Sequence, residues 1–327
     1  MNRDTISVLR GKDDETFEEP ITSQIASTAA QKIIVTGDFN RDNVLDIAIA
    51  FTGTGYIRIV FGIGNGTFGK ETTISVTNCY IIAAIFVADL NNDNYSDIVI
   101  ACILNNFLGI LFANTNETFS KIMTFDTGAY SSPSSIAITD FNNDNYLDIA
   151  VVNYNRNVGI FLGRGNGSFD AQKRSFTGGQ TVPVHIAVGD FNEDGKQDIV
   201  VSYELRSAIG VMFGYGNGTF SERLKLMLDA GYSENPIIVS DFNNDYHLDI
   251  AAFTYSPYTL NIFYGDGKGN FEMYRIYSSE ADNENYLIFS ADFNNDSYQD
   301  IIFCSDNGIN IFSNTAQCDN VSQILAI

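Results

Sequence analysis

Short apolar runs alternate with segments rich in Gly and Asn along the chain, and the same order of runs returns every 50 or 51 residues. Within one period, the run 185–189 precedes an acidic segment, and a second run, 198–202, follows it. A third run at 208–213, a glycine turn at 214–218 and a fourth run from Phe220 complete the unit. Because these runs are too short and too often interrupted for helices, each period predicts four β-strands.

The period identifies the fold class. About 50 residues with four short strands is the size of one β-propeller blade. Inner runs are almost wholly apolar, as burial on both faces of a sheet requires, whereas outer runs such as 221–228 alternate. The constant spacing argues against two separate β-sandwiches. We therefore predict an all-β fold, a β-propeller of four-stranded blades that forms a single domain over 1–327. The six repeats begin near residues 33, 84, 135, 185, 236 and 287.

The ends of the chain suggest how the fold closes. Residues 1–31 match the tail of a repeat, because Phe17 stands 21 residues before the first acidic segment, just as Phe68 stands 21 residues before the second. We expect six blades, with the strand near 17–25 completing the last blade, so that pairing of N- and C-terminal strands closes the propeller. In the alternative, residues 321–327 provide that fourth strand and a seventh blade is left incomplete.

Each repeat carries an acidic segment with Asp at its first, fifth and ninth positions and Asn at its third. These are hard oxygen donors, and a main-chain carbonyl at position 7 would add a ligand of the kind that calcium favours. Three carboxylates in one loop repel one another unless they are protonated or a cation neutralises them. We therefore predict about six structural calcium ions. The predicted ligands are Asp38, Asn40, Asp42, Val44, Asp46, Asp89, Asn91, Asp93, Tyr95, Asp97, Asp140, Asn142, Asp144, Tyr146, Asp148, Asp190, Asn192, Asp194, Lys196, Asp198, Asp241, Asn243, Asp245, His247, Asp249, Asp292, Asn294, Asp296, Tyr298 and Asp300.

Position 6, where the loop must bend, is Asn or Gly in four copies. Tyr246 and Ser297 depart from this preference, so the fifth and sixth loops rank lower as calcium sites. The spacing excludes an EF-hand, whose Glu at position 12 would fall on apolar residues. Asx-rich turns without metal are the alternative interpretation. Six bound ions would change the net charge from −22 to −10.

The pattern resembles a known repeat. Asp-Phe-Asn-x-Asp-x-x-x-Asp-Ile, followed by turns such as Phe61-Gly-Ile-Gly or Phe213-Gly-Tyr-Gly, is similar to the FG-GAP (VCBS-type) repeat of integrin α-subunit propellers and of related bacterial, fungal and invertebrate proteins. The match covers residues 5–315, although the second and sixth repeats lack the glycine turn. This resemblance implies a β-propeller with calcium in its loops, usually extracellular, that acts in adhesion or ligand binding.

The charge and hydropathy of the chain limit the classes of partner that it can bind. With 18 Lys and Arg against 40 Asp and Glu, the chain repels phosphate backbones and anionic bilayers, so we expect neither nucleic-acid binding nor membrane insertion. Residues 1–10 lack the apolar core of a signal peptide, so the protein is either intracellular or the mature part of a longer precursor. Weak calcium sites fill only outside the cell. We therefore expect a monomeric extracellular domain of a larger secreted or surface protein.

The cysteines and the glycosylation sequons add little to this picture. Four cysteines are too few for a disulfide framework, and their spacings match no zinc site. Cys304 and Cys318 either form a bridge near the C-terminus or are small buried apolar residues. Sequons that are compatible with an extracellular protein begin at Asn65, Asn116, Asn166, Asn217 and Asn320.

No constellation of catalytic residues is evident. Of the two histidines, His185 lies on an inner run and is interpreted as a packed residue, and His247 lies in an acidic segment. No nucleophile motif occurs, and the constant period leaves no room for a long catalytic insertion. We therefore predict a binding module rather than an enzyme, with a glycan or a protein as ligand. The alternative is a calcium-dependent propeller enzyme of the lyase or dehydratase type that acts on polysaccharide.

Aromatic side chains are the candidates for stacking on a sugar, and because the chain has no Trp, tyrosines would have to serve. Their mere presence at a surface is weak support. The candidates are Tyr56, Tyr130, Tyr154, Tyr203, Tyr232 and Tyr258.

Overall fold

The structure is a computed structural model of the chain. It describes residues 3–12, 17–26, 32–115, 117–177, 182–204, 208–222, 224–228, 237–254, 259–277, 287–305, 308–314 and 324–326. The regular elements within these ranges are all β-strands. In the described part of the chain, we find no helix with the length and apolar character needed to span a membrane.

Six four-stranded sheets account for most of the strands, and in each sheet the spatial order of the strands follows the chain. The first three sheets are β3(Lys32–Gly37), β4(Asp46–Phe51), β5(Tyr56–Gly62) and β6(Phe68–Ser75); β7(Ile82–Ala88), β8(Asp97–Cys102), β9(Phe107–Leu111) and β12(Met123–Asp126); and β13(Pro133–Thr139), β14(Asp148–Asn153), β15(Asn157–Phe161) and β16(Lys173–Phe176). The last three are β17(Pro183–Gly189), β18(Asp198–Tyr203), β19(Ala208–Met212) and β20(Leu224–Met227); β21(Ile237–Ser240), β22(Asp249–Thr254), β23(Thr259–Gly265) and β24(Phe271–Tyr277); and β25(Leu287–Ala291), β26(Asp300–Ser305), β27(Gly308–Phe312) and β28(Ile324–Ala326). A short hairpin, β10(Ala113–Asn114) with β11(Thr118–Phe119), lies between β9 and β12 in the chain.

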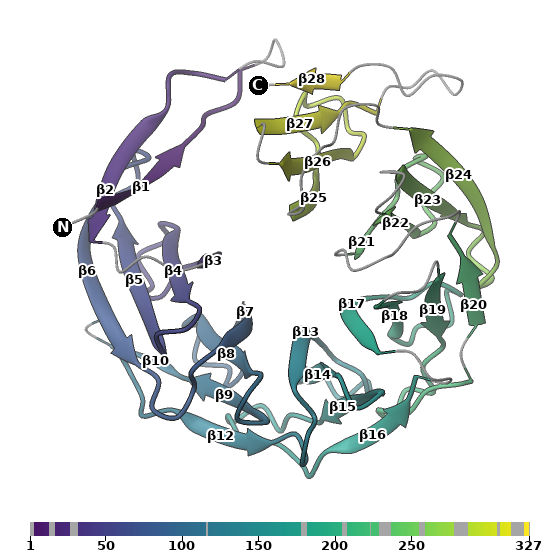
Figure 1. Ribbon diagram of the computed structural model, residues 1–327, viewed down its shortest axis with the longest axis horizontal. Coiled ribbons are helices and arrows are strands. Elements are labelled where there is room, and N and C mark those ends of the chain that lie inside the picture. Colours follow the sequence, from purple (N-terminus) through teal and green to yellow (C-terminus); the bar gives the residue numbers. More distant parts are fainter. Residues whose placement is uncertain are drawn as a thin grey trace. The chain divides into compact units, whose positions relative to one another are not determined.

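These sheets are the blades that the sequence predicts, and the all-β fold class, a six-bladed β-propeller with four strands per blade, is confirmed. The structure divides into two compact units. The first contains most of the first three blades, and the second contains the last three blades together with residues 141–143 of the third acidic loop and the end of β16. Within each blade the strands lie side by side in chain order (Figure 1). That residues 1–327 form a single domain stays a prediction.

The core of each unit lies between neighbouring blades. The strand β8 shows how one strand serves two cores: Ile98 and Ile100 pack toward the first blade, whereas Val99 and Ala101 pack toward the third. All four side chains are fully buried. This burial on both faces explains why the second strands are continuous apolar runs rather than alternating ones.

The prediction that an N-terminal strand completes the last blade is wrong. The fourth strand of the sixth blade is β28, which pairs with β27, as in the alternative that assigned it to residues 321–327. Of that range, 321–323 and 327 lie outside the described residues. The N-terminal segment forms a separate hairpin, β1(Arg3–Val8) with β2(Ile21–Ala26).

The hairpin β1–β2 has the register of the outer half of a blade. Thr5 pairs with Gln24, and 51 residues further on Tyr56 pairs with Ser75 in the first blade. The hairpin lies next to β6 (Figure 1), and Ile6 and Ile25 share a hydrophobic cluster with the first blade. The N-terminal segment therefore buries apolar side chains on the first blade.

A disulfide that the sequence analysis did not identify joins Cys79 to Cys102. Cys79 follows β6 of the first blade, and Cys102 ends β8 of the second, so the bond links two neighbouring blades. Both residues are buried. Of the pair Cys304 and Cys318, Cys318 lies outside the described residues.

Candidate functional site

The acidic segments form tight loops between the first and second strands of the blades. In the first loop, the N–H of Asp42 donates to Asp38 Oδ1 and to Asn40 Oδ1, both at 3.1 Å. The N–H of Asn43 donates to Asp38 Oδ2 at 2.9 Å, and that of Val44 to Asp42 Oδ1 at 2.8 Å. Bonds of the same kind recur in the other five loops. The side chains at positions 1, 3 and 5 are thus held by the backbone of their own loop.

All six loops share one backbone conformation. Position 4 has φ between 54° and 64°, and position 6 has φ between 63° and 78°. For Arg41, Glu193, Tyr246 and Ser297 this left-handed conformation costs on the order of 1 kcal/mol each. Tyr246 and Ser297 therefore bend the fifth and sixth loops in the same way as Asn or Gly bends the others, and their departure from the preferred residue types does not change the loop.

The Asp at position 9 is buried and joins two segments of its blade. Asp46 Oδ2 accepts a hydrogen bond from the N–H of Phe39 in the acidic loop at 2.9 Å, and Oδ1 accepts one from the N–H of Gly62 at 2.8 Å. Gly62 begins the turn between the third and fourth strands. In every blade the position-9 Asp is fully buried, and one of its oxygens accepts a hydrogen bond from the corresponding turn.

Burial of these carboxyl groups changes their acidity. It raises the pKa of Asp46 and Asp198 from 3.8 to about 6, and that of Asp97 and Asp249 to about 7. The pKa of Asp300 is raised for the same reason. Backbone N–H donors oppose the rise, whereas the carboxylates at positions 1 and 5 add to it. Each of these loops therefore holds a negative charge that a proton or a cation would stabilise.

The donor types of each loop fit calcium, because carboxylate and amide oxygens are its preferred ligands. The structure gathers positions 1, 3 and 5 in one loop, but it holds the position-9 carboxylate on backbone N–H groups. In the part of the chain that is described, no three Asp, Glu, His or Cys side chains lie close enough together to hold a metal ion. The structure therefore supplies the oxygen donors for calcium without assembling the three carboxylates into one group.

Steric contacts explain why the first residue of the glycine turn is glycine. A Cβ atom at Gly62 would lie 2.3 Å from the carbonyl oxygen of Leu45, and one at Gly163 would lie 2.1 Å from that of Leu147. This close approach brings the N–H of the turn within hydrogen-bonding distance of the buried Asp. Where the glycine turn is missing, the N–H of Ala113 or of Asn314 makes the bond instead.

At the opposite ends of the strands, the connection between the second and third blades presents an exposed tyrosine. Tyr130 is 88% exposed and has φ of 57°, and Ser132 has φ of 44°. The N–H of Ser132 donates to Asn106 Oδ1 at 2.9 Å, and the buried hydroxyls of Thr127 and Ser131 share a hydrogen bond of 2.6 Å. The strained conformation of the loop is therefore held by a hydrogen bond within it and by one to Asn106 of the preceding turn, and strained backbone is common at binding sites.

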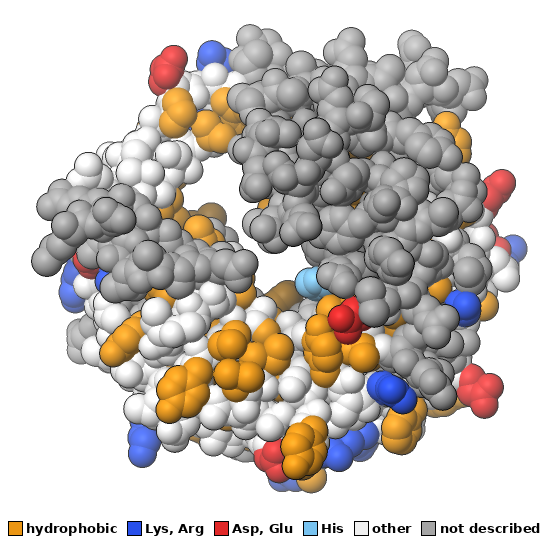
Figure 2. Space-filling model, in the orientation of Figure 1, with side chains coloured by type: hydrophobic (Ala, Val, Ile, Leu, Met, Phe, Trp, Pro, Cys, Tyr) orange, Lys and Arg blue, Asp and Glu red, His pale blue; other side chains and the backbone are white. Residues whose placement is uncertain are grey.

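The remaining candidate tyrosines differ in how far they are exposed to solvent. Tyr56 and Tyr154 are partly exposed. Tyr203 is not a surface residue, because only 1% of it is exposed and its hydroxyl donates to the carbonyl oxygen of Thr177 at 3.0 Å. Tyr232 and Tyr258 lie outside the described residues. Hydrophobic side chains gather over the second and third blades on the face in view (Figure 2).

The two histidines lie in different environments. His185 lies on β17 and is half-buried, and His247 Nδ1 contacts Glu193 Oε1 of the preceding acidic loop, which raises the pKa of the imidazole.

Among the glycosylation sequons, Asn65, Asn166 and Asn217 are exposed in their turns. Asn116 and Asn320 lie outside the described residues.

Comparison with protein families gives one match. The model for FG-GAP-like repeats matches residues 38–100, 140–201, 190–252 and 241–303. These ranges begin at the first Asp of the first, third, fourth and fifth acidic loops. A search of curated protein sequences gave no match.

Solved structures with the same fold differ widely in what they bind. A lectin from Agrocybe aegerita, solved for its recognition of non-reducing terminal N-acetylglucosamine, is 16% identical with a TM-score of 0.66 over 99% of this chain and 89% of its own. BBS1N in complex with ARL6DN is 13% identical, with a TM-score of 0.60 over 87% of this chain and 78% of its own. A candidate 6-phosphogluconolactonase from Bacteroides uniformis is 11% identical, with a TM-score of 0.66 over 98% and 90%. At such identities the likeness concerns the fold alone.

Proposed function

The chain belongs to the family of proteins with FG-GAP-like repeats, and from this premise we propose that it is an extracellular recognition module, stabilised by calcium, that binds a glycan or a protein. We propose that it has no catalytic activity of its own. The observation that carries the proposal is the repeated acidic loop, which gathers the oxygen donors at positions 1, 3 and 5 and whose carboxylates at positions 1 and 5 add to the raised pKa of the buried carboxyl group at position 9.

Calcium would be held by the oxygens at positions 1, 3, 5 and 9 of each loop, with the main-chain carbonyl at position 7 as a further ligand. The ion would supply charge neutralisation rather than Lewis-acid chemistry. Burial, and to a smaller extent the carboxylates at positions 1 and 5, raise the pKa of residues such as Asp97 by disfavouring the ionised form, and a bound cation would stabilise that form. Binding to the folded state alone would stabilise the protein. The ligand set in the first loop is Asp38, Asn40, Asp42, Val44 and Asp46.

An extracellular setting is supported by the bond between Cys79 and Cys102. Structural disulfides persist in oxidising compartments and are rare in the cytosol. Millimolar calcium outside the cell would also fill sites of low affinity. The disulfide and the proposed calcium sites thus favour the same compartment.

We infer that the surface around Tyr130 contacts the ligand. An exposed ring on a backbone held by hydrogen bonds loses little conformational freedom on binding, so it is suited to stacking on a sugar or to contact with a protein. The Agrocybe aegerita lectin shows that one protein of this fold recognises a sugar. This supports a glycan as the first ligand class to test.

The test is a glycan array probed with the calcium-loaded protein, with metal-stripped protein and with a Tyr130→Ala variant. We expect binding that is lost on metal removal and reduced about tenfold or more by Tyr130→Ala. Tyr215→Ala is the matched control, because Tyr215 is 58% exposed but lies in a glycine turn at the other ends of the strands. Equal binding by the Tyr130→Ala variant would contradict the site, and turnover of a polysaccharide would contradict the absence of catalysis.

A further inference from the structure

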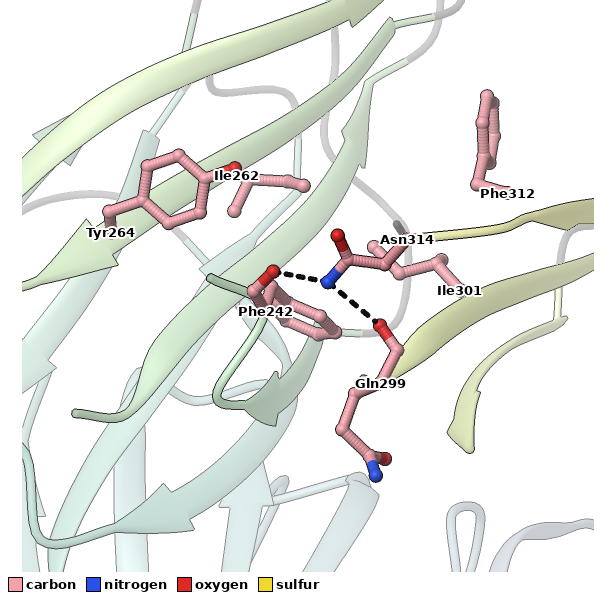
Figure 3. Close-up of a pocket in the computed structure, with 7 residues that line it drawn as sticks. All are labelled: Phe242, Ile262, Tyr264, Gln299, Ile301, Phe312 and Asn314. Atoms are coloured by element: carbon pink, nitrogen blue, oxygen red, sulfur yellow. Dashed lines mark hydrogen bonds between the residues drawn. The ribbon is translucent and has the colours of Figure 1, made fainter. Parts of the chain in front are cut away.

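A pocket lies between the fifth and sixth blades, beside the fifth acidic loop (Figure 3). The space between its walls and in front of its open mouth amounts to about 270 Å³, part of which is solvent outside the pocket. Phe242, Ile262, Ile301 and Phe312 form apolar walls, and Asn314 lies between them and the backbone of Gln299. The proposed function does not use this pocket.

At other junctions between blades, a phenyl ring of the chain fills the corresponding place. Phe119 of the second blade packs on Phe39 of the first acidic loop, with ring centroids 5.8 Å apart. The same arrangement joins Phe220 to Phe141 at 5.7 Å, and Phe271 to Phe191 at 5.8 Å. Each ring from the later blade belongs to a residue that stands 30 positions after the first Asp of its own acidic loop.

The sixth blade does not supply this ring. Counting 30 positions from Asp292, the first Asp of its acidic loop, leads to Ser322. Ser322 lies outside the described residues, and its side chain contains no ring. Phe242 therefore occupies the place of Phe39, Phe141 and Phe191 without a phenylalanine at the partner position.

The polar frame of this junction is nevertheless kept. In the fourth and fifth blades, the N–H groups of Gly218 and Gly269 donate to the carbonyl oxygens of Phe141 and Phe191, at 3.1 and 3.2 Å. The sixth blade has no glycine turn, and the side-chain amide of Asn314 donates to the carbonyl oxygen of Phe242 instead. The junction is thus assembled like its neighbours, and the missing part is one aromatic ring.

We propose that this pocket binds the uncharged phenyl ring of a small aromatic molecule. Apolar walls favour a ring that leaves water, and Phe242 offers the contact that its counterparts make with a second ring. A polar substituent on the ring would face the open mouth. A ligand of the benzyl alcohol class has both features.

The test uses the full chain with methyl-labelled isoleucine and 4-fluorobenzyl alcohol as probe. We expect saturable binding in fluorine NMR, with methyl shifts at Ile262 and Ile301. Ser322→Phe, which restores the ring in sequence, should weaken binding about tenfold or more. Phe271→Ala should open a second pocket at Phe191 and raise the stoichiometry from one to two.

Binding by the Phe271→Ala variant but not by the original chain would overturn the proposal, as would methyl shifts that spare both isoleucines. Cyclohexylmethanol is the control for ring character, and binding as tight as that of the aromatic probe would contradict a phenyl site. Capture of a phenylalanine-containing peptide without binding of the small probe would likewise overturn it. The isoleucine shifts report on the site even if Ser322→Phe does not fold.

Discussion

Because the pKa values of the buried aspartates are raised, the metal-free protein should become less stable as pH rises from acidic toward neutral values. The folded-state pKa is about 6 for Asp46 and Asp198 and about 7 for Asp97 and Asp249, against 3.8 as the ordinary value. Between these limits the folded chain binds more protons than the unfolded chain. The free energy of unfolding therefore falls as pH rises through this interval.

The pKa values of these four aspartates also determine how much unfolding free energy is lost as pH rises. Each carboxyl group contributes a slope of up to about 1.4 kcal/mol per pH unit between its unfolded and folded pKa values. Four groups titrate in overlapping ranges. We therefore expect the metal-free protein to lose at least about 2 kcal/mol of unfolding free energy between pH 5 and pH 6.

The assay is urea unfolding at pH 5, 6 and 7, on protein stripped of metal with a chelating resin and again in millimolar calcium. Because the chain has no Trp, circular dichroism follows the strands. In the proposed sites calcium would bind the ionised carboxylates, so the difference in stability between loaded and stripped protein should grow with pH. A metal-free protein whose stability is flat or rises from pH 5 to pH 7 would refute the reasoning, and an equal effect of calcium at all three pH values would refute the ligand assignment.

Three further outcomes are expected from single features of the blades. Replacing Cys79 and Cys102 by Ser should lower the unfolding free energy by about 3 kcal/mol, because a bridge across 23 residues restricts the unfolded chain, and denaturant unfolding measures this. Gly214→Ala should cost about 1–3 kcal/mol in the same assay, because its Cβ would lie 2.2 Å from a carbonyl oxygen, whereas Gly11→Ala meets nothing within 4 Å and should be neutral. Tyr203→Phe should cost about 1 kcal/mol through the lost bond from its hydroxyl, and an unchanged melting curve would contradict that bond.

Much of the fold was accessible from the sequence because its determinants are local and repeated. The six acidic segments mark where the first strand ends and the second begins, and the strands β4, β8, β14, β18, β22 and β26 all start at the ninth position. The four-stranded unit follows from apolar runs and glycine turns within one period. The left-handed bends of the loops were foreseen for Asn43 and its counterparts, and the structure extends them to Tyr246 and Ser297.

Contacts between blades were harder to predict, because they depend on single positions rather than on the repeat. The last residue of the second strand is Cys102 in the second blade and Tyr203 in the fourth, and each bonds to the connection that precedes its own blade. From the sequence alone, Tyr203 was interpreted as a surface residue, and only its burial in the structure shows that it belongs to a contact between blades. The N-terminal hairpin was misplaced for a similar reason, since its pairing repeats the register of β5 and β6 while its packing surface is the first blade.

The bridge between Cys79 and Cys102 also has a dynamic consequence. This disulfide links the first and second blades covalently. The contacts described for the fourth and fifth blades with the blades before them are hydrogen bonds and packed rings. Transient opening should therefore begin at a junction held only by such contacts. Amide hydrogens of β8 should then exchange with solvent more slowly than those of β22, and reduction of the bridge should even out the two rates.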